Sequence, residues 1–418
     1  MPERNHLIDL ARVGSVLVVV VFHALLWQVL LVDGQVRVVP WAPGPVLWAI
    51  SWVGTIIPVF FVAAGYANAV VVDKWRAAGD SYGEFLTLRG SRLLGPMTLF
   101  VAVFTLIGSM AAWLGQQREA EQLSRQFAQL LWFAVVYLLL LAAAPLAVRL
   151  HDRFGGWVLL PLALATIAVD VVVRATGDLG LQWLNLAFVW PLAHQWGIAY
   201  HRGWFRDWPG RRLVVLFAAG AAVIATLVFG LGYPPAAVAW ADVLVANLQP
   251  PTVAIAVLGL AQTCGLGLVE RAGLADRLPA RVLSLVRVAN ALLLTVYLWH
   301  IPAIVVAASL LVGLSLALPA AATVLMHPLL LVLVVLVVVA AGAPLLARLE
   351  LRLIPSRASG APRPGWAEAA YALFAAGTWA VWQWGAVLHP ATPLAVAAVA
   401  LFAVGVVALR RVTTHPAG

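Results

Sequence analysis

The sequence predicts an all-α protein, a polytopic bundle of about ten to twelve transmembrane helices. Of its 418 residues, 63% are hydrophobic and only 10% are charged, whereas soluble domains usually carry about 25% charged residues. Mean hydropathy is +0.97. Long apolar runs recur along the whole chain, and the linkers between them are short and rich in Pro, Gly and Arg. These observations exclude a soluble globular class.

Each predicted helix rests on an apolar run of about 20 residues, the length that crosses a bilayer. No small-residue cleavage site follows the first run, so we expect a retained helix and not a signal peptide. The single cysteine, Cys264, excludes a disulfide framework within the chain and a multi-cysteine metal site. In chain order the twelve runs are 11–32, 46–72, 93–114, 127–148, 157–173, 181–200, 213–231, 253–269, 288–311, 325–347, 367–387 and 392–409.

Basic residues predict the orientation, because Lys and Arg are enriched in cytoplasmic loops. With a cytoplasmic N-terminus, 22 of the 26 basic residues lie on the cytoplasmic side, and those opposite are Arg37, Arg118, Arg125 and Arg174. We therefore expect an even number of helices, both termini in the cytoplasm and a plasma-membrane location. The net charge of +9 would face anionic lipid headgroups, and no nucleic-acid partner is expected.

The first apolar run, LARVGSVLVVVVFHALLW, carries two ionisable residues, Arg12 and His23. They are eleven residues apart, which in a helix puts them on one face, roughly 16 Å apart along the axis. Asp9 precedes Arg12 by three residues, a spacing that allows an ion pair. Ionisable groups inside a membrane are costly and usually mark a functional site.

This pair suits proton abstraction beside a phosphate-bearing ligand. Imidazole can take a proton from a hydroxyl near neutral pH, and the planar guanidinium of arginine can hold phosphate. Together His23 and Arg12 indicate a base reached from the cytoplasm by a long anionic acyl donor such as acyl-coenzyme A. The alternative is a structural histidine and an arginine whose head reaches the membrane surface.

Other polar residues inside the apolar runs are weaker candidates. His194 and Gln195 lie in the sixth run and His300 in the ninth, and either histidine could contact substrate or serve only as a structural hydrogen-bonding group. Neither a neighbouring carboxylate nor an HxxxH spacing supports a metal, so none is expected. Gln262 is interpreted as a structural amide between helices.

The segment NLQPPT (247–252) contains two prolines, which cannot occupy a regular helix interior, so we expect a broken or re-entrant chain there. Asn247, Gln249 and Thr252 could then line an acceptor pocket. The alternative is a capped loop in which Thr252 is an N-cap and no residue contacts substrate.

Several motifs occur in an order that resembles the membrane-bound acyltransferase 3 family. LIDLAR (7–12) followed by His23 is similar to its opening signature, and FFVAAGY (60–66) and RGSRLLGP (89–96) are similar to its next segments. NLAFVWPLAHQWGIAYHRG (185–203), NLQPPT (247–252) and VYLWHIP (296–302) resemble stretches of actinobacterial members. The resemblance covers roughly 6–348. Two positions depart from it, since Ala64 replaces a serine and LWFAVVYLLL (131–140) lacks a glutamate found in many sugar-modifying members.

The resemblance implies an acyl-CoA-dependent O-acyltransferase. It would move an acyl group, expected to be acetyl, to a hydroxyl of a glycan, lipid or secondary metabolite, with no bound cofactor. His23 would be the general base, and Arg12, Arg92 and Arg89 would hold the donor. By themselves, Arg89 and Arg92 before the third run are equally explained by cytoplasmic retention. We expect the family domain over 1–348, and over 349–418 a cytoplasmic linker and two additional transmembrane helices.

Two other functions stay open on the sequence. A proton-coupled secondary transporter would suit twelve helices, buried histidines and a proline-broken segment. Against it, the membrane core is poor in carboxylates, with Asp170 near a helix end as the only close case, and no two-fold sequence repeat is apparent. A non-catalytic membrane protein of envelope biogenesis is the third interpretation.

Overall fold

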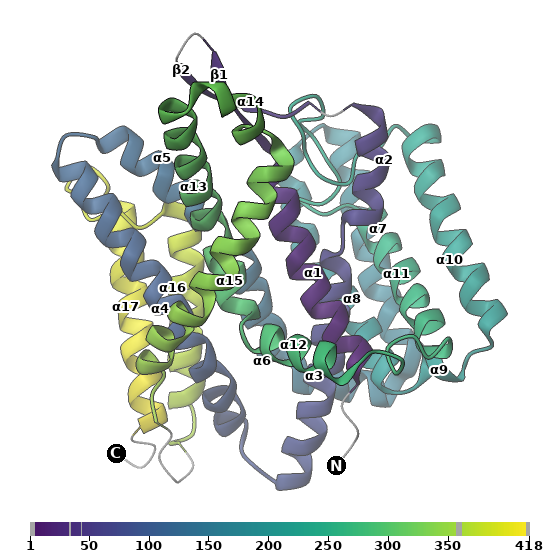
Figure 1. Cartoon of the computed structure of the whole chain (residues 1–418). Coiled ribbons are helices and arrows are strands. Elements are labelled where there is room, and N and C mark those ends of the chain that lie inside the picture. Colours follow the sequence, from purple (N-terminus) through teal and green to yellow (C-terminus); the bar gives the residue numbers. More distant parts are fainter. Residues whose placement is uncertain (1–4, 33–34, 43, 357–361, 415–418) are drawn as a thin grey trace. The chain divides into compact units, whose positions relative to one another are not determined.

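The computed structural model describes residues 5–32, 35–42, 44–356 and 362–414. Arg4 and Arg357, which the charge pattern places on the cytoplasmic side, lie outside the described residues. Figure 1 shows a chain built almost wholly of helices, and the all-α prediction is confirmed. Among the described residues the only paired strands are β1 (Trp27–Val32) and β2 (Gln35–Pro40), which form an antiparallel hairpin.

The helices follow one another along the chain with short connections. The first half comprises α1 (His6–Leu25), α2 (Pro45–Gly54), α3 (Ile57–Ala78), α4 (Tyr82–Trp113), α5 (Gln117–Ala128), α6 (Leu131–Phe154), η1 (Gly155–Val158), α7 (Leu159–Thr176), η2 (Leu179–Asn185) and α8 (Leu186–His201). The second half comprises α9 (Trp204–Asp207), α10 (Gly210–Ala225), η3 (Thr226–Gly230), α11 (Val253–Arg271), α12 (Ala280–Ala291), α13 (Leu293–Ala317), η4 (Pro319–Ala321), α14 (Ala322–Leu325), α15 (Pro328–Leu353), α16 (Trp366–Trp384) and α17 (Pro393–Thr414).

Nine helical stretches in the described part of the chain are long and apolar enough to cross a membrane. Eight of the twelve predicted spans correspond to one stretch each, and the spans 127–148 and 157–173 fall together in the continuous stretch Gln117–Thr176. The other two, 181–200 and 367–387, correspond to α8 and α16, which are not among the nine. With 16 residues, α8 is about 24 Å long, shorter than the bilayer core of about 30 Å.

The predicted first span, 11–32, is wrong at its C-terminal end. Helix α1 stops at Leu25, and residues 27–32 pair with 35–40 as a hairpin. Both strands are rich in valine, whose β-branched side chain suits a pleated surface. A run of apolar residues therefore does not by itself predict the secondary structure of this segment, and Trp27, Leu30 and Val38 of the hairpin are exposed.

The chain divides into two compact units. Unit 1 comprises Met1–Val72, Ala144–Leu293 and Ala303–Val338, and it carries the candidate pair on α1. Unit 2 comprises Asp73–Ala143, Leu294–Pro302 and Val339–Gly418. The boundary predicted after residue 348 stays a prediction.

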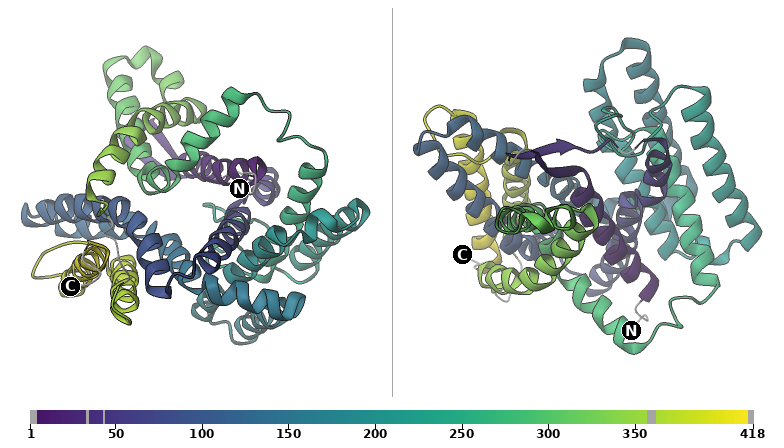
Figure 2. Two further views of the ribbon diagram at one scale, coloured as in Figure 1. Left: turned by 90° about the horizontal axis from the view of Figure 1, so that it is seen from below. Right: turned by 45° about the horizontal axis from the view of Figure 1, so that its top comes forward.

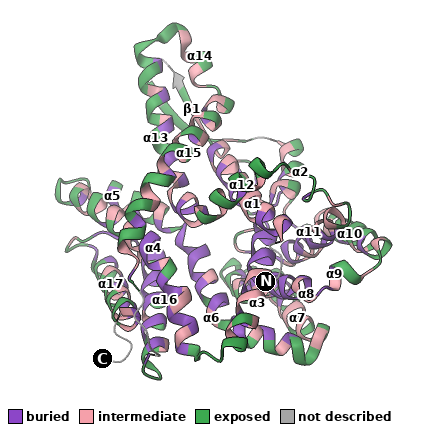
Figure 3. Ribbon diagram, turned by 60° about the horizontal axis from the view of Figure 1, so that its bottom comes forward, coloured by how far each residue is buried: buried purple, intermediate pink, exposed green. Residues whose placement is uncertain are grey.

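The core of unit 1 is centred on α3, whose first half is almost completely buried (Figure 3). Glycines let α3 and α8 touch backbone to backbone: a Cβ on Gly65 would lie 2.0 Å from the carbonyl oxygen of His194, and a Cβ on Gly197 1.9 Å from that of Val62. The FFVAAGY motif thus supplies the small residue at a helix crossing that leaves no room for a side chain.

Unit 2 contains a similar glycine contact between α16 and α17. A Cβ on Gly377 would lie 2.4 Å from the Phe402 Cα, and a Cβ on Gly405 would lie 2.6 Å from the Phe374 Cα. The two C-terminal helices therefore form a tightly packed pair.

Candidate active site

Helix α1 supplies the two main candidate residues. The Asn5 side chain caps it by accepting a hydrogen bond from the Ile8 amide at 3.1 Å. Because α1 is helical from His6 to Leu25, Arg12 and His23 fall on one face, as their spacing predicts. Both side chains are partly exposed, so neither is sealed in the core.

A backbone contact fixes the protonation pattern of the His23 ring. Its Nδ1 lies 2.8 Å from the Val19 carbonyl oxygen. A carbonyl can only accept, so we assign the ring proton to Nδ1, and Nε2 becomes the nitrogen with a lone pair. A general base needs such a nitrogen at a fixed position.

Arg12 packs its guanidinium toward an aromatic ring. The guanidinium carbon lies 6.0 Å from the centroid of the Phe60 ring, at the outer limit for a cation–π contact. Its Nε is buried and has no hydrogen-bond partner among the described residues. The preceding Asp9 accepts a hydrogen bond from the Asn290 side chain of α12, which ties α1 to that helix.

A polar pocket of about 510 Å³ opens at the N-terminal end of α1. One wall is organised by the Glu270 carboxylate, whose Oε1 accepts from the Asn5 amide at 3.1 Å and whose Oε2 accepts from the Tyr200 hydroxyl at 2.6 Å. The pocket is lined by Asn5, His6, Leu7, Tyr66, Arg206, Glu270, Ala275, Asp276 and Leu283.

His194 lies within the core of unit 1. It is buried, and its Nε2 is 3.1 Å from the Asn68 Nδ2. An amide nitrogen only donates, so His194 Nε2 accepts here. This contact gives His194 a structural hydrogen bond between α3 and α8, and its role toward substrate stays a prediction.

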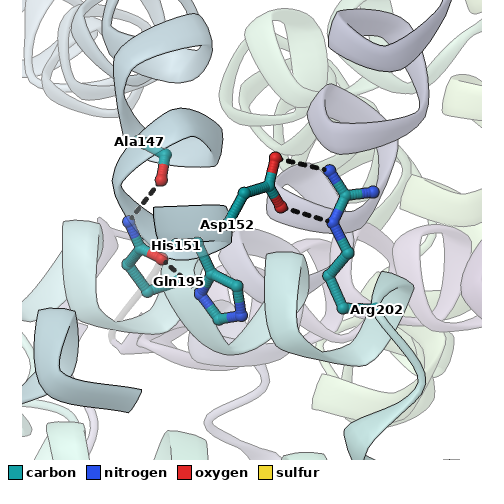
Figure 4. Close-up of polar contacts among 5 residues, drawn as sticks. All are labelled: Ala147, His151, Asp152, Gln195 and Arg202. Atoms are coloured by element: carbon teal, nitrogen blue, oxygen red, sulfur yellow. Dashed lines mark hydrogen bonds and ion pairs between the residues drawn. The ribbon is translucent and has the colours of Figure 1, made fainter. Parts of the chain in front are cut away.

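The neighbouring Gln195 joins α8 to α6 (Figure 4). Its Oε1 accepts from His151 Nδ1 at 3.0 Å, and its Nε2 donates to the Ala147 carbonyl at 3.2 Å. Beside them, the Arg202 guanidinium donates two hydrogen bonds, of 2.8 and 3.1 Å, to the two carboxylate oxygens of Asp152. The sequence analysis did not single out His151, which is buried close to the end of α6.

The segment between η3 and α11, residues 231–252, is not helical, as its prolines predict. Asn247 is fully buried and holds the segment together: its amide donates to the Pro234 and Ala236 carbonyls at 2.8 and 2.9 Å, and its oxygen accepts from the Thr252 hydroxyl at 2.9 Å. Gln249 is exposed. An acceptor-binding role for these residues stays a prediction.

The Asp170 carboxylate on α7 caps the first turn of α11. Thr252 occupies the N-cap position, as the capped-loop alternative predicts, but its side chain makes no capping bond. Instead the Asp170 carboxylate, 2% exposed, accepts four hydrogen bonds. Its Oδ1 accepts from Gln182 at 2.7 Å and Asn185 at 2.8 Å, and its Oδ2 accepts from the Tyr233 hydroxyl and the Val253 amide, each at 2.8 Å.

The Tyr233 hydroxyl keeps its proton and donates it in a hydrogen bond to Asp170. Burial, and after it the Asp170 carboxylate, raise the pKa of the Tyr233 phenol well above its ordinary value. The ring also faces a cation, since the Arg174 guanidinium carbon lies 4.9 Å from the ring centroid. The 231–252 segment is thereby fastened to α7 at one end.

The other part of the same segment packs on the C-terminal end of α1, next to His23. Trp240 is buried against Phe22 and Leu26, and its ring centroid lies 5.9 Å from those of Phe22 and Trp41. Backbone bonds from Trp41 to Leu26 and from Ala241 to Trp41, 3.0 and 3.1 Å long, join the three pieces. Aromatic side chains thus enclose the end of the helix that carries the candidate base.

Unit 2 holds the remaining candidates, Arg89, Arg92 and His300. Both arginines lie inside α4 and not before it, because Ser81 starts the helix with a capping box. Arg89 is partly exposed and Arg92 is exposed. His300 is buried, with Nδ1 2.5 Å from the Tyr297 carbonyl oxygen. Their joint action with Arg12 and His23 of unit 1 stays a prediction.

Asp170, which the sequence offers as the only carboxylate close to the membrane core, is not alone among the described residues. Asp9 on α1 and Glu350 on α15, which is 3% exposed, are also buried. In unit 2 Glu350 accepts hydrogen bonds from the Thr295 hydroxyl and, at 3.2 Å, from the Trp299 indole. The sequence analysis missed Glu350, although a glutamate at the end of a long apolar run is a readable signal. Among the described residues, no group of three or more His, Cys, Asp or Glu side chains could hold a metal ion.

The chain belongs to the acyltransferase 3 family, whose model, described as an acyltransferase domain, matches residues 5–348. No curated protein and no solved structure gives a significant match. The match covers more than half of the chain and includes both candidate residues of α1. Together with the apolar helices it defines a membrane-embedded acyltransferase, which favours the enzyme over a transporter or a non-catalytic partner.

Proposed function

We propose that this acyltransferase moves an acyl group, in the first instance acetyl, from acyl-coenzyme A to a hydroxyl acceptor, with His23 as general base. The observation that carries the proposal is the Nδ1 contact to the Val19 carbonyl. It holds the ring in one orientation and leaves Nε2 as the nitrogen that takes a proton.

In the proposed reaction the acceptor oxygen attacks the thioester carbonyl carbon while its proton passes to His23 Nε2. The tetrahedral intermediate then collapses, the carbon–sulfur bond breaks, and the sulfur leaves as a thiolate. The imidazolium returns the proton to that thiolate. The products are an ester and free coenzyme A, and the imidazole is regenerated.

Arg12 supports a phosphate-bearing donor. Arg12 is partly exposed and lies on the His23 face of α1, roughly 16 Å from His23 along the axis. Coenzyme A has a matching layout, because its pantetheine arm separates the phosphates from the thioester. The polar pocket at the same end of α1 adds Arg206 and His6. The family resemblance supports a further proposal, that Arg89 and Arg92 of unit 2 also bind phosphate of the donor.

The N-terminal end of α1 is proposed to face the cytoplasm, where acyl-coenzyme A is made, and the protein to lie in the plasma membrane with both termini inside. Basic residues of the predicted cytoplasmic loops support this orientation. The acceptor would then meet the donor near the C-terminal end of α1, beside Trp240 and Phe22.

The test measures free thiol released from acetyl-CoA by purified protein, together with acetyl transfer to extracted membrane lipids and glycans. His23→Ala should lose about 10²–10⁴-fold in transfer, the usual contribution of a general base. His23→Gln keeps a hydrogen-bonding side chain but cannot take the proton, so it should be nearly as inactive. A well-folded His23→Gln protein with normal turnover contradicts the assignment.

A further inference from the structure

A groove of about 600 Å³ lies in unit 1, outside the site on α1. Its lining comes from α2, α10, η3 and α11, which lie within stretches long and apolar enough to span the membrane, and from Pro235 of the 231–252 segment. The volume falls in the range of small-molecule sites, about 300–1,000 Å³. The lining includes Trp48, Trp52, Ala221, Ala225, Leu258 and Gln262.

Helix α10 forms the outer side of the groove. Among the residues of α10, only Leu213 and Gly220 are buried, and the helix lies at the edge of unit 1, largely exposed (Figures 2 and 3). Its close approach to α11 is at Gly220, where a Cβ would lie 2.9 Å from the Ala261 Cβ. Beyond that point α10 continues as the π-helical turn η3, a distortion that often accompanies functional sites. The groove therefore opens on the side where lipid surrounds the protein.

Gln262 is the one amide side chain among the described residues of this lining, and the indole N–H groups of Trp48 and Trp52 already donate to Asp242 and to the Pro235 carbonyl. The Gln262 Nε2 donates to the Thr55 carbonyl at 2.8 Å, which fixes the amide. Its Oε1 is buried and has no hydrogen-bond partner among the described residues, and the same holds for the hydroxyl oxygen of Thr55, which is 3% exposed. An amide oxygen only accepts, so the ligand group that suits it is a donor such as a hydroxyl.

The chain segment that holds Gln262 also contacts α1. Residues Thr55 and Ile56 form the break between α2 and α3, and the Ile56 carbonyl accepts from the Ser15 hydroxyl of α1 at 3.3 Å. One residue earlier, a Cβ on Gly54 would lie 2.4 Å from the Phe22 ring. The break between α2 and α3 therefore contacts Gln262 of the groove through Thr55. Through Ile56 it contacts α1, the helix that carries His23.

We propose that the groove binds the hydrocarbon chain of a membrane lipid that bears a hydroxyl, and that this lipid is the acyl acceptor. The proposal rests on the proposed function, whose acceptor it specifies. An apolar lining within membrane-spanning helices suits a hydrocarbon chain, and a single buried acceptor oxygen suits one hydroxyl. A free glycan would need many polar partners that this lining does not offer.

Photolabelling in nanodiscs tests the binding step without catalysis. The probe is a 16-carbon primary alcohol with a diazirine in its chain, and the competitors are hexadecanol and hexadecane. Labelling of α10, η3 or α11 should be displaced by hexadecanol and much less by hexadecane. Ala221→Trp and Ala225→Trp, which fill the groove, should lose the displaceable labelling. Ala222→Trp, on the same helix outside the lining, should keep it.

Two polar variants test recognition of the hydroxyl. Gln262→Leu and Thr55→Val should lose the preference for the alcohol over the alkane, and Thr55→Val keeps the backbone carbonyl that holds Gln262. Equal displacement by alcohol and alkane in the wild type overturns the proposal. So do unchanged labelling in Ala221→Trp and Ala225→Trp, and photocrosslinks from position 225 to a second copy of the chain.

The two proposals fail in different ways. His23→Ala should show wild-type labelling, because the groove does not need the base. If acetyl-CoA releases thiol but labelling is not displaced by alcohol, the groove assignment is wrong and the acyl-CoA mechanism stands. If labelling behaves as expected but no thiol is released, the groove still binds the lipid alcohol, while the acyl-CoA mechanism and the acceptor role of that lipid are wrong.

Discussion

Replacing Asp170 by asparagine should destabilise the protein much more than replacing an exposed aspartate of the 231–252 segment, because Asp170 is the buried residue that holds this segment to α7. In the native protein each carboxylate oxygen accepts two hydrogen bonds, from Gln182 and Asn185 on one side and from Tyr233 and the Val253 amide on the other. An asparagine has the same shape, but one of its two terminal groups is an NH₂ that only donates. Whichever way the amide is turned, two of the four donors then face another donor.

The expected cost follows from that count. A hydrogen bond to a charged group contributes about 1.5–3 kcal/mol, so losing two costs about 3–6 kcal/mol. That is a large part of the roughly 5–15 kcal/mol that stabilises a typical folded domain. The segment anchored by Asp170 also packs on the end of α1 beside His23, so transfer activity should fall with the loss of stability.

The matched control is Asp242→Asn in the same segment. Asp242 is exposed and accepts hydrogen bonds from the Gly44 amide at 3.1 Å and the Trp48 indole at 3.2 Å. Surface substitutions of this kind usually change stability by about 0.5 kcal/mol or less. Thermal unfolding of the three proteins in one detergent measures the difference. Equal melting temperatures for Asp170→Asn and Asp242→Asn would refute the reasoning.

Three further predictions follow from the helices of unit 1. Arg12→Lys should weaken binding of acyl-CoA, because lysine keeps the charge but loses the bidentate fork, and Arg12→Ala should weaken it more; unchanged apparent affinity in both would leave Arg12 only a structural role. Gly197→Ala should unfold the protein or separate α3 from α8, because its Cβ has no room. Gly14→Ala is the control, since nothing lies within 4 Å of its Cβ, and its melting temperature should stay near that of the wild type. Cysteine labelling from outside intact cells should reach 232–250 and not 201–212, and labelling of both ranges from one side would contradict the orientation.

Hydrophobic patterning was enough to predict the fold class, because the bilayer leaves a spanning chain few choices. Backbone groups in lipid must be satisfied locally, and a long apolar run does so as a helix. For the same reason the sequence placed Arg12 and His23 on one face, since that relation depends only on the helical period within α1. The pattern was less informative at 27–40, where apolar and β-branched residues suit a hairpin as well as a helix.

Tertiary structure decided what the polar side chains do. Asp170 has partners 12, 15, 63 and 83 residues away along the chain, and no local pattern predicts which of them it meets. The sequence left open whether Asn247 and His194 contact substrate or hold the fold. The structure gives each a structural hydrogen bond, Asn247 within the 231–252 segment and His194 between α8 and α3, and a contact with substrate stays a prediction. The sequence alone determined where the chain is apolar and helical, because those properties act over a few residues. The pairing of buried polar groups depends on how helices pack, and only the folded chain fixes it.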